Sequence, residues 1–202
     1  MPRTAIVAIS VLLFCLPSAA QYQYKWDWGL SAGFSPGSTQ GIGVTPHRQL
    51  FQAGAEAGFV LHRWTSTTLK YRVAVLPLIL VHTSANTHTF GNATFVETNQ
   101  TTYGGGVEPI GVQFNFRTSH RVQPLAMATG GALYFTRQVP VPNSSQYNFS
   151  FSFGTGLEIF AGDAHSVTVG YRYLHISNGY TAKYNPGIDN NVIFVAVLFK
   201  RR

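Results

Sequence analysis

Cysteine is nearly absent from this chain of 202 residues, and its one cysteine, Cys15, lies in the first apolar segment. A disulfide framework is therefore excluded. Charged residues are also scarce, at 10% of the chain, against roughly 25% in ordinary soluble domains. Beyond the N-terminus no apolar run reaches the ~20 residues of a membrane helix. The longest run, Val73 to Val81, is interrupted by Pro77.

The first twenty residues have the pattern of a signal peptide. A short basic start containing Arg3 precedes the apolar run Ala5 to Leu16, and the small residues Ser18-Ala19-Ala20 follow. We expect residues 1–20 to be cleaved after Ala20, which leaves residues 21–202 as a single domain. An uncleaved N-terminal anchor helix is the alternative interpretation.

The net charge is +7, and it becomes about +6 when Arg3 is removed with the signal peptide. A positive charge suits an anionic partner. The surplus is spread along the chain instead of forming a basic cluster. We therefore expect no nucleic-acid partner.

Aromatic residues are abundant, at 14%, and the chain holds 20 glycines. Apolar and polar residues alternate with a period of two, which is typical of strands with two different faces. The alternating segments lie at about 25–34, 51–61, 69–75, 110–116, 121–136, 147–159, 167–173 and 190–199. Eight such segments, low charge and many aromatics predict an all-β fold, an eight-stranded antiparallel transmembrane β-barrel of the outer-membrane type. A soluble lipocalin-like barrel is the alternative.

The predicted connections alternate between long and short. The long ones, rich in Gly, Pro, Asn and Thr, are 35–50, 84–105, 137–146 and 178–189, and the short ones are 63–66, 117–120 and 161–164. Outer-membrane barrels have long outer loops and tight periplasmic turns, with both termini in the periplasm. The chain is therefore expected in the bacterial outer membrane, with loop 178–189 on the outer side.

Charged residues within the segments fall on the face opposite the aromatics. These residues are Glu56, Lys70, Arg72, Glu158 and Arg172. In a barrel of eight strands they would point inward and pair in a filled lumen. An open channel is not expected.

The seventh segment carries a polar group on its lipid-facing side. Tyr171, Tyr173 and His175 share that face, and Ser177 follows two residues later. At 3.3 Å per residue, the Cα atoms of His175 and Ser177 would lie about 6.6 Å apart, a distance that two side chains can bridge. Asp189 stands across the loop at the start of the next segment. A carboxylate there can reach back toward the histidine.

A serine, a histidine and a carboxylate at one strand end form the set used for acyl transfer. His175 would accept the proton of Ser177, and Asp189 would fix the histidine tautomer. Asn178 and the backbone of Gly179 are the adjacent candidates for oxyanion donors. From spacing alone, a histidine that merely lies at the membrane interface is the commoner interpretation of such a pattern, and the catalytic one is the alternative.

The segment His175-Ile176-Ser177-Asn178-Gly179, followed by Asn185-Pro186-Gly187-Ile188-Asp189, resembles the signature of the lipid A 3-O-deacylase (PagL) family. The resemblance is dense over about 171–199, and elsewhere it consists of the signal peptide and the eight segments. It implies an eight-stranded barrel with its catalytic groups on the outer, lipid-facing wall, close to the lipopolysaccharide leaflet. The implied activity is a serine esterase that removes an ester-linked acyl chain from lipid A.

The family's histidine, serine and asparagine correspond to His175, Ser177 and Asn178. Its acidic residue, usually glutamate, corresponds to Asp189, which is one methylene shorter. Family members often carry an extra small residue after the asparagine, whereas Gly179 follows Asn178 directly here.

The expected partners are lipopolysaccharide (its lipid A part) as substrate and the surrounding outer-membrane lipids, and a homodimer is left open. No cofactor and no metal are expected. Two other functions remain open: a non-catalytic barrel for adhesion or membrane stability, and a phospholipid esterase that uses the same site.

Two other motifs suggest sites but fit them poorly. Gly33-Phe34-Ser35-Pro36-Gly37 matches the nucleophile elbow of α/β-hydrolases in letters only, because Pro36 has no N–H to offer an oxyanion. His82, His88 and Glu97 have no common metal-ligand spacing, and we interpret them as polar loop residues.

Overall fold

The computed structural model describes residues 23–202. The predicted signal peptide and Cys15 lie outside the described residues. The strands are β1 (Trp26–Ser35), β2 (Ser38–Thr39), β3 (Arg48–Arg63), β4 (Thr67–Thr83), β5 (Asn86–Phe90), β6 (Ala93–Glu97), β7 (Gln100–Phe116), β8 (Val122–Val139), β9 (Ser145–Phe160), β10 (His165–Ser177) and β11 (Ile188–Arg201). The described residues include no helix of the length and hydrophobicity that crossing a membrane requires.

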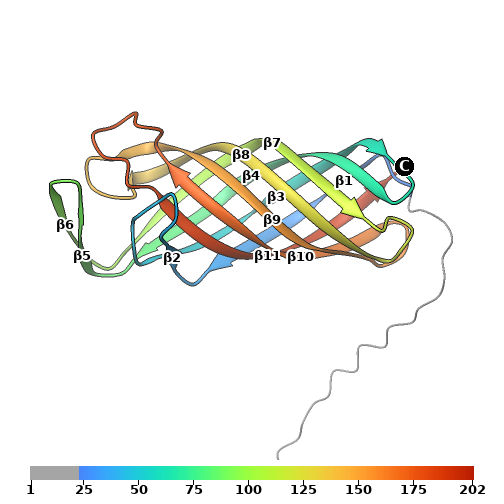
Figure 1. Ribbon diagram of the computed structural model, residues 1–202, viewed down its shortest axis with the longest axis horizontal. Helices are drawn as coiled ribbons and strands as arrows, with labels where there is room; N and C mark the ends of the chain where they lie inside the picture. The colour runs from blue at the N-terminus through green and yellow to red at the C-terminus, as the bar shows by residue number, and fades with distance from the viewer. Residues whose placement is uncertain (1–22) are drawn as a thin grey trace, which may run out of the picture.

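Eight of these strands form one closed sheet (Figure 1). Their order is β1-β3-β4-β7-β8-β9-β10-β11, every neighbouring pair is antiparallel, and β1 pairs with β11 to close the barrel. Closure leaves no exposed edge along the wall. The prediction of an eight-stranded antiparallel barrel is confirmed. The two residues of β2 extend the sheet beside the start of β11.

The connections differ at the two ends of the barrel. At the end that holds the C-terminus in Figure 1 they are short turns, and at the other end they are long and include β2, β5 and β6. The predicted loop 84–105 is partly wrong, because β4 continues to Thr83, β7 begins at Gln100, and β5 and β6 form a separate hairpin between them. The strands continue beyond the apolar band, where polar side chains on both faces erase the alternation that marks a strand in the sequence.

The outer and inner faces of the wall differ in polarity as predicted. On β9 the exposed row is Tyr147, Phe149, Phe151, Phe153, Leu157 and Ile159. The alternate residues Asn148, Ser150, Ser152 and Glu158 are buried. An extended apolar outer wall around a polar interior is the arrangement of a barrel in lipid. A soluble lipocalin-like barrel would have the opposite arrangement.

Paired charges fill one half of the lumen. Lys70 Nζ lies 3.1 Å from both Asp27 Oδ2 and Glu158 Oε2. Arg72 lies 2.9 Å from Asp27 and 2.7 Å from Glu56. The predicted inward pairing is confirmed for Lys70 with Glu158 and for Arg72 with Glu56, and Asp27 is a further partner that was not predicted.

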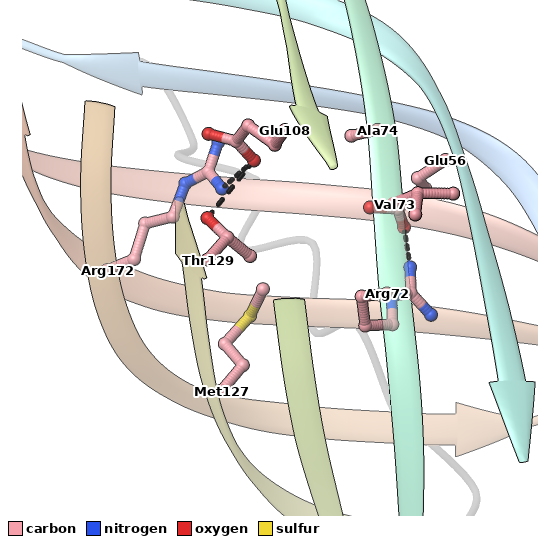
Figure 2. Close-up of a pocket in the computed structure, with 8 residues that line it drawn as sticks. All are labelled: Glu56, Arg72, Val73, Ala74, Glu108, Met127, Thr129 and Arg172. Atoms are coloured by element: carbon pink, nitrogen blue, oxygen red, sulfur yellow. Dashed lines mark hydrogen bonds and ion pairs between the residues drawn. The ribbon is translucent and has the colours of Figure 1, made fainter. Parts of the chain in front are cut away.

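Further along the lumen, Arg172 and Thr129 converge on Glu108, at 3.5 and 3.1 Å (Figure 2). The cavity between this group and the Arg72–Glu56 pair has a volume of about 10 Å³, which is room for roughly one water molecule. Toward the long loops the lumen is closed by buried apolar side chains. These include Leu50, Val81, Phe135, Leu174 and Ile176. The inner side of β10 therefore rests on a packed core.

Candidate active site

The direction of each side chain on β10 follows from the strand period of two. Val167, Val169 and Tyr171 are exposed on the outer wall, and His175 and Ser177 continue the same row, half-buried. Leu174 and Ile176, which alternate with them, are buried on the lumenal side (2% and 0% exposed). His175 and Ser177 therefore lie on the outer wall, at the end of the strand nearest the long loops.

His175 is paired with Asp189 across two neighbouring strands. The two residues stand opposite each other in the β10–β11 register, and His175 Nδ1 lies 2.6 Å from Asp189 Oδ1. The histidine side chain is 14% exposed and the aspartate side chain is fully buried. An ionised carboxylate can only accept, so Nδ1 carries the proton in this contact and Nε2 is left as the basic nitrogen.

The first long loop covers the carboxylate of Asp189 from outside. Thr39 of β2 pairs with Asp189 in the sheet, and the backbone N–H of Gly43 donates to Asp189 Oδ2 at 2.8 Å. The Tyr173 hydroxyl lies beside the same carboxylate, since a Cβ on Gly41 would be 3.0 Å from both its oxygen and Asp189 Oδ2, and the Ile42 N–H donates to that hydroxyl at 3.3 Å. No local sequence pattern indicates the contacts of Thr39, Ile42 and Gly43, whose partners lie more than 130 positions further along the chain.

Ser177 is the last residue of β10 and stands opposite Phe149 of β9. In the part of the chain that the structure describes, His175 is hydrogen-bonded to Asp189 but not to Ser177. The histidine and the acid are thus assembled, and the serine lies two residues away on the same face. Contacts between nucleophile and base are often loose without substrate and tighten when it binds.

Asn178 organises the loop that follows. It is fully buried, its Nδ2 donates to the Tyr184 carbonyl at 2.7 Å, and its backbone N–H donates to Asn185 Oδ1 at 2.9 Å. One proton of the Asn178 side-chain amide is therefore used in a hydrogen bond to the loop. Gly179 is exposed and has a positive φ of 60°, which points the chain sharply away from the strand.

Gly187 is a further residue of the site that the sequence argument did not single out for a role. Its φ is +66°, and a Cβ at this position would lie 2.9 Å from Cε1 of His175. The absence of a side chain thus lets the loop pack against the imidazole. The run Asn185-Pro186-Gly187 was a turn signal that could have indicated this close approach.

His82, His88 and Glu97 do not come together. His88 Nδ1 lies 3.5 Å from Glu97, whereas His82 Nδ1 lies 3.0 Å from the Thr101 hydroxyl. Between residues 23 and 202 there is no group of three His, Cys, Asp or Glu side chains placed to hold a metal ion.

Comparison with known proteins assigns the chain to a family. The model of the lipid A 3-O-deacylase (PagL) family matches residues 18–197. The chain belongs to the lipid A 3-O-deacylase (PagL) family. The resemblance inferred from residues 175–189 is confirmed at the level of the family.

Solved structures that share the fold include two outer-membrane barrels. The crystal structure of the outer membrane enzyme PagL has 16% identity and a TM-score of 0.61, and the match covers 83% of this chain and 97% of that one. Neisserial surface protein A has 15% identity and a TM-score of 0.52, with 87% and 96% covered. No curated protein matches the chain in sequence. Membership of the family supports a function of the lipid A deacylase kind, and the shared barrel fold supports an outer-membrane location.

Proposed function

We propose that the protein is a serine esterase that hydrolyses an ester-linked acyl chain of lipid A in the outer leaflet. Ser177 is the nucleophile, His175 the general base and Asp189 the acid that orients the base. The observation that carries the proposal is the 2.6 Å contact between His175 Nδ1 and Asp189 Oδ1, two residues from a serine on the same face of the wall.

The position of these polar groups supports a lipid substrate. An ionisable side chain on the hydrocarbon-facing wall is costly, and such residues mark functional sites by default. An ester bond of a membrane lipid lies in that same shell. Hydrolysis of a water-soluble ester would not require a histidine on the lipid-facing wall.

The reaction divides into two acyl transfers. Nε2 of His175 takes the Ser177 proton while Ser177 Oγ attacks the ester carbonyl, and the resulting imidazolium is stabilised by Asp189. The imidazolium then protonates the departing sugar oxygen, which leaves the acyl group on Ser177. Water, deprotonated by the same nitrogen, attacks the acyl-enzyme, and the fatty acid departs as the proton returns to Ser177.

The oxyanion formed in each step needs N–H donors close to Ser177. Asn178 and the Gly179 backbone adjoin the nucleophile and take this role in the proposal. Asn178 is fully buried, with one amide proton held by Tyr184 and its backbone N–H held by Asn185, so the exposed Gly179 N–H is the readier donor and the second amide proton of Asn178 must turn toward the substrate to take part.

The test is the mass of lipid A from a lipopolysaccharide-bearing host that expresses the protein. The wild type should remove one hydroxyacyl chain, and Ser177→Ala and His175→Ala should each abolish this loss. Ser119→Ala and His120→Ala are matched controls, because these residues form a Ser–His contact of 3.1 Å at the opposite rim. Both controls should retain full activity.

An unchanged lipid A mass with a folded wild-type barrel would contradict the proposal. It would favour the non-catalytic barrel for adhesion or membrane stability. Release of fatty acid from phospholipids but not from lipid A would instead identify a phospholipid esterase with the same groups.

A further inference from the structure

We propose that the first long loop, residues 36–47, is a working part of the active site. In this proposal the Tyr173 hydroxyl and the Gly43 N–H are positioning groups that hold Asp189 against His175. The inference rests on the proposed function, since it assigns roles around the same acid and base.

The carboxylate of Asp189 is fully buried although it faces the outer wall. Burying a carboxylate is unfavourable unless hydrogen-bond donors surround it. Two donors are bonded to it here, His175 Nδ1 and the Gly43 N–H, and the Tyr173 hydroxyl lies beside it. His175 is the base itself, and we infer that the other two groups fix the direction in which the carboxylate points. Tyr173 is the titratable side chain in contact with the pair, and Tyr171 stands one step beyond it.

The loop approaches the carboxylate through glycines. A Cβ on Gly41 would lie 3.0 Å from both Asp189 Oδ2 and the Tyr173 hydroxyl oxygen. A Cβ on Gly43 would lie 2.9 Å from Asp189 Oδ1 and 2.8 Å from the carbonyl carbon of Gly187. Contacts this short leave room for backbone alone, so the loop can donate to the acid only with glycine at these positions.

The same loop is attached to the segment that carries Asp189. The Val44 N–H donates to the Pro186 carbonyl at 2.8 Å, and the Thr45 N–H donates to the Gly187 carbonyl at 3.2 Å. On the other side, β2 pairs with the first residues of β11. The loop is therefore fixed on both sides of Gly43, and its N–H is presented to the acid in one geometry.

This arrangement suits a short acid. Aspartate reaches His175 from a stem with one methylene, so small rotations of its side chain would break the 2.6 Å contact. Donors from Gly43 and Tyr173 restrict that rotation. Preorganisation of a catalytic group by its neighbours is what keeps it in productive geometry.

Tyr173→Phe is the first test, with Tyr171→Phe as its matched control. The Tyr171 hydroxyl lies on the same face of the same strand but donates to Asn191, at 2.5 Å. We expect Tyr173→Phe to lower kcat about tenfold with little change in KM, since a hydroxyl beside the buried carboxylate is lost. Tyr171→Phe should leave both constants unchanged.

A double-mutant cycle separates positioning from general damage. If Tyr173 acts through Asp189, Tyr173→Phe should cause no further loss in an Asp189→Ala background. Equal losses in both backgrounds would overturn the proposal. For the loop, Gly43→Ala should lower kcat at least tenfold, whereas Gly37→Ala should be neutral because no atom lies within 4 Å of its Cβ position.

The Nδ1 proton resonance of His175, measured by NMR in detergent micelles, gives a readout that does not require activity. It should disappear in Asp189→Ala, move in Tyr173→Phe and stay in place in Tyr171→Phe. If the resonance moves as expected but lipid A is not hydrolysed, the positioning role stands and the proposed function fails. If lipid A is hydrolysed but Tyr173→Phe changes neither the resonance nor kcat, the positioning role fails and the function stands.

Discussion

At the residue scale, the chemistry depends on which nitrogen of His175 is basic. The contact of 2.6 Å with Asp189 commits Nδ1, so Nε2 is the nitrogen that can accept the Ser177 proton. The sequence could place His175 and Ser177 on one face because strand side chains alternate with a period of two. It could not reveal the contact between Gly43 and Asp189, because 146 residues separate the partners and no local pattern records that distance.

Asp189→Glu should lower turnover about tenfold, although glutamate is the usual acid of the family. The carboxylate is fully buried between His175 and the Gly43 N–H, and an added methylene would push it into the loop or out of line with Nδ1. Kinetics on purified lipid A, with Asp189→Asn for comparison, measure the effect. Turnover above the wild-type level would show instead that the shorter acid limits the enzyme.

At the element scale, the long loops at one end of the barrel are linked to one another by side-chain contacts. Arg48 of β3 is fully buried and lies 2.6 Å from Glu97 of β6, and it also donates to the Pro140 carbonyl at 2.9 Å. The ring of Phe95 in β6 contacts the ring of Tyr184 edge-on, at 5.2 Å between centroids. Hairpin β5–β6 is thereby linked to the loop that carries Asn178.

The hairpin was not predicted, and the reason is physical. Residues 86–97 are mostly polar, and their few apolar residues, such as Phe95 and Val96, fall on opposite faces, so they lack the apolar alternation that marks a strand of the wall. Their pairing is stabilised by contacts with Arg48 and Tyr184 from distant segments. The eight long strands were predictable because each has one face in lipid, and this requires apolar residues at every second position of the local sequence.

The hairpin should loosen in acid. Burial lowers the pKa of His88 below its ordinary value of 6.5, an effect that the nearby Glu97 opposes and Arg48 and His47 reinforce. The folded hairpin therefore binds fewer protons at His88 than the unfolded one, so the contribution of neutral His88 to its stability is present above pH 6.5 and is lost as the pH falls below that value. Limited proteolysis between residues 84 and 99 should be faster at pH 5.5 than at pH 7.5.

His88→Gln supplies the control for this measurement, because glutamine is polar but takes no proton. The ratio of cleavage rates at the two pH values should be smaller in this variant than in the wild type. An identical ratio in both proteins would show that another group is responsible.

At the scale of the whole molecule, the barrel is a closed wall around a filled lumen. Lys70, Asp27 and Glu158 are buried together, and a packed apolar core lies behind the outer part of β10. The inward direction of these charges was predictable from the strand period. Their pairing partners across the lumen were not, because register and shear decide which strands face each other.

Lys70→Met should destabilise the barrel by about 3–5 kcal/mol, since it leaves Asp27 and Glu158 buried with fewer counter-charges. Arg202→Gln removes an exposed ion pair with Asp163, at 3.2 Å, and should change stability by less than about 0.5 kcal/mol. Urea unfolding in lipid vesicles or detergent micelles compares the two. Equal stability of Lys70→Met and wild type would contradict the role of the lumenal network.

The most direct test of the central claim is covalent labelling of the folded barrel with a lipophilic fluorophosphonate, followed by mass analysis of its peptides. The claim is that Ser177 is a nucleophile activated by His175 on the lipid-facing wall. One adduct on Ser177, absent in His175→Ala and retained in His120→Ala, is the predicted result. A folded barrel that takes no label, or takes it on a different serine, would contradict the account.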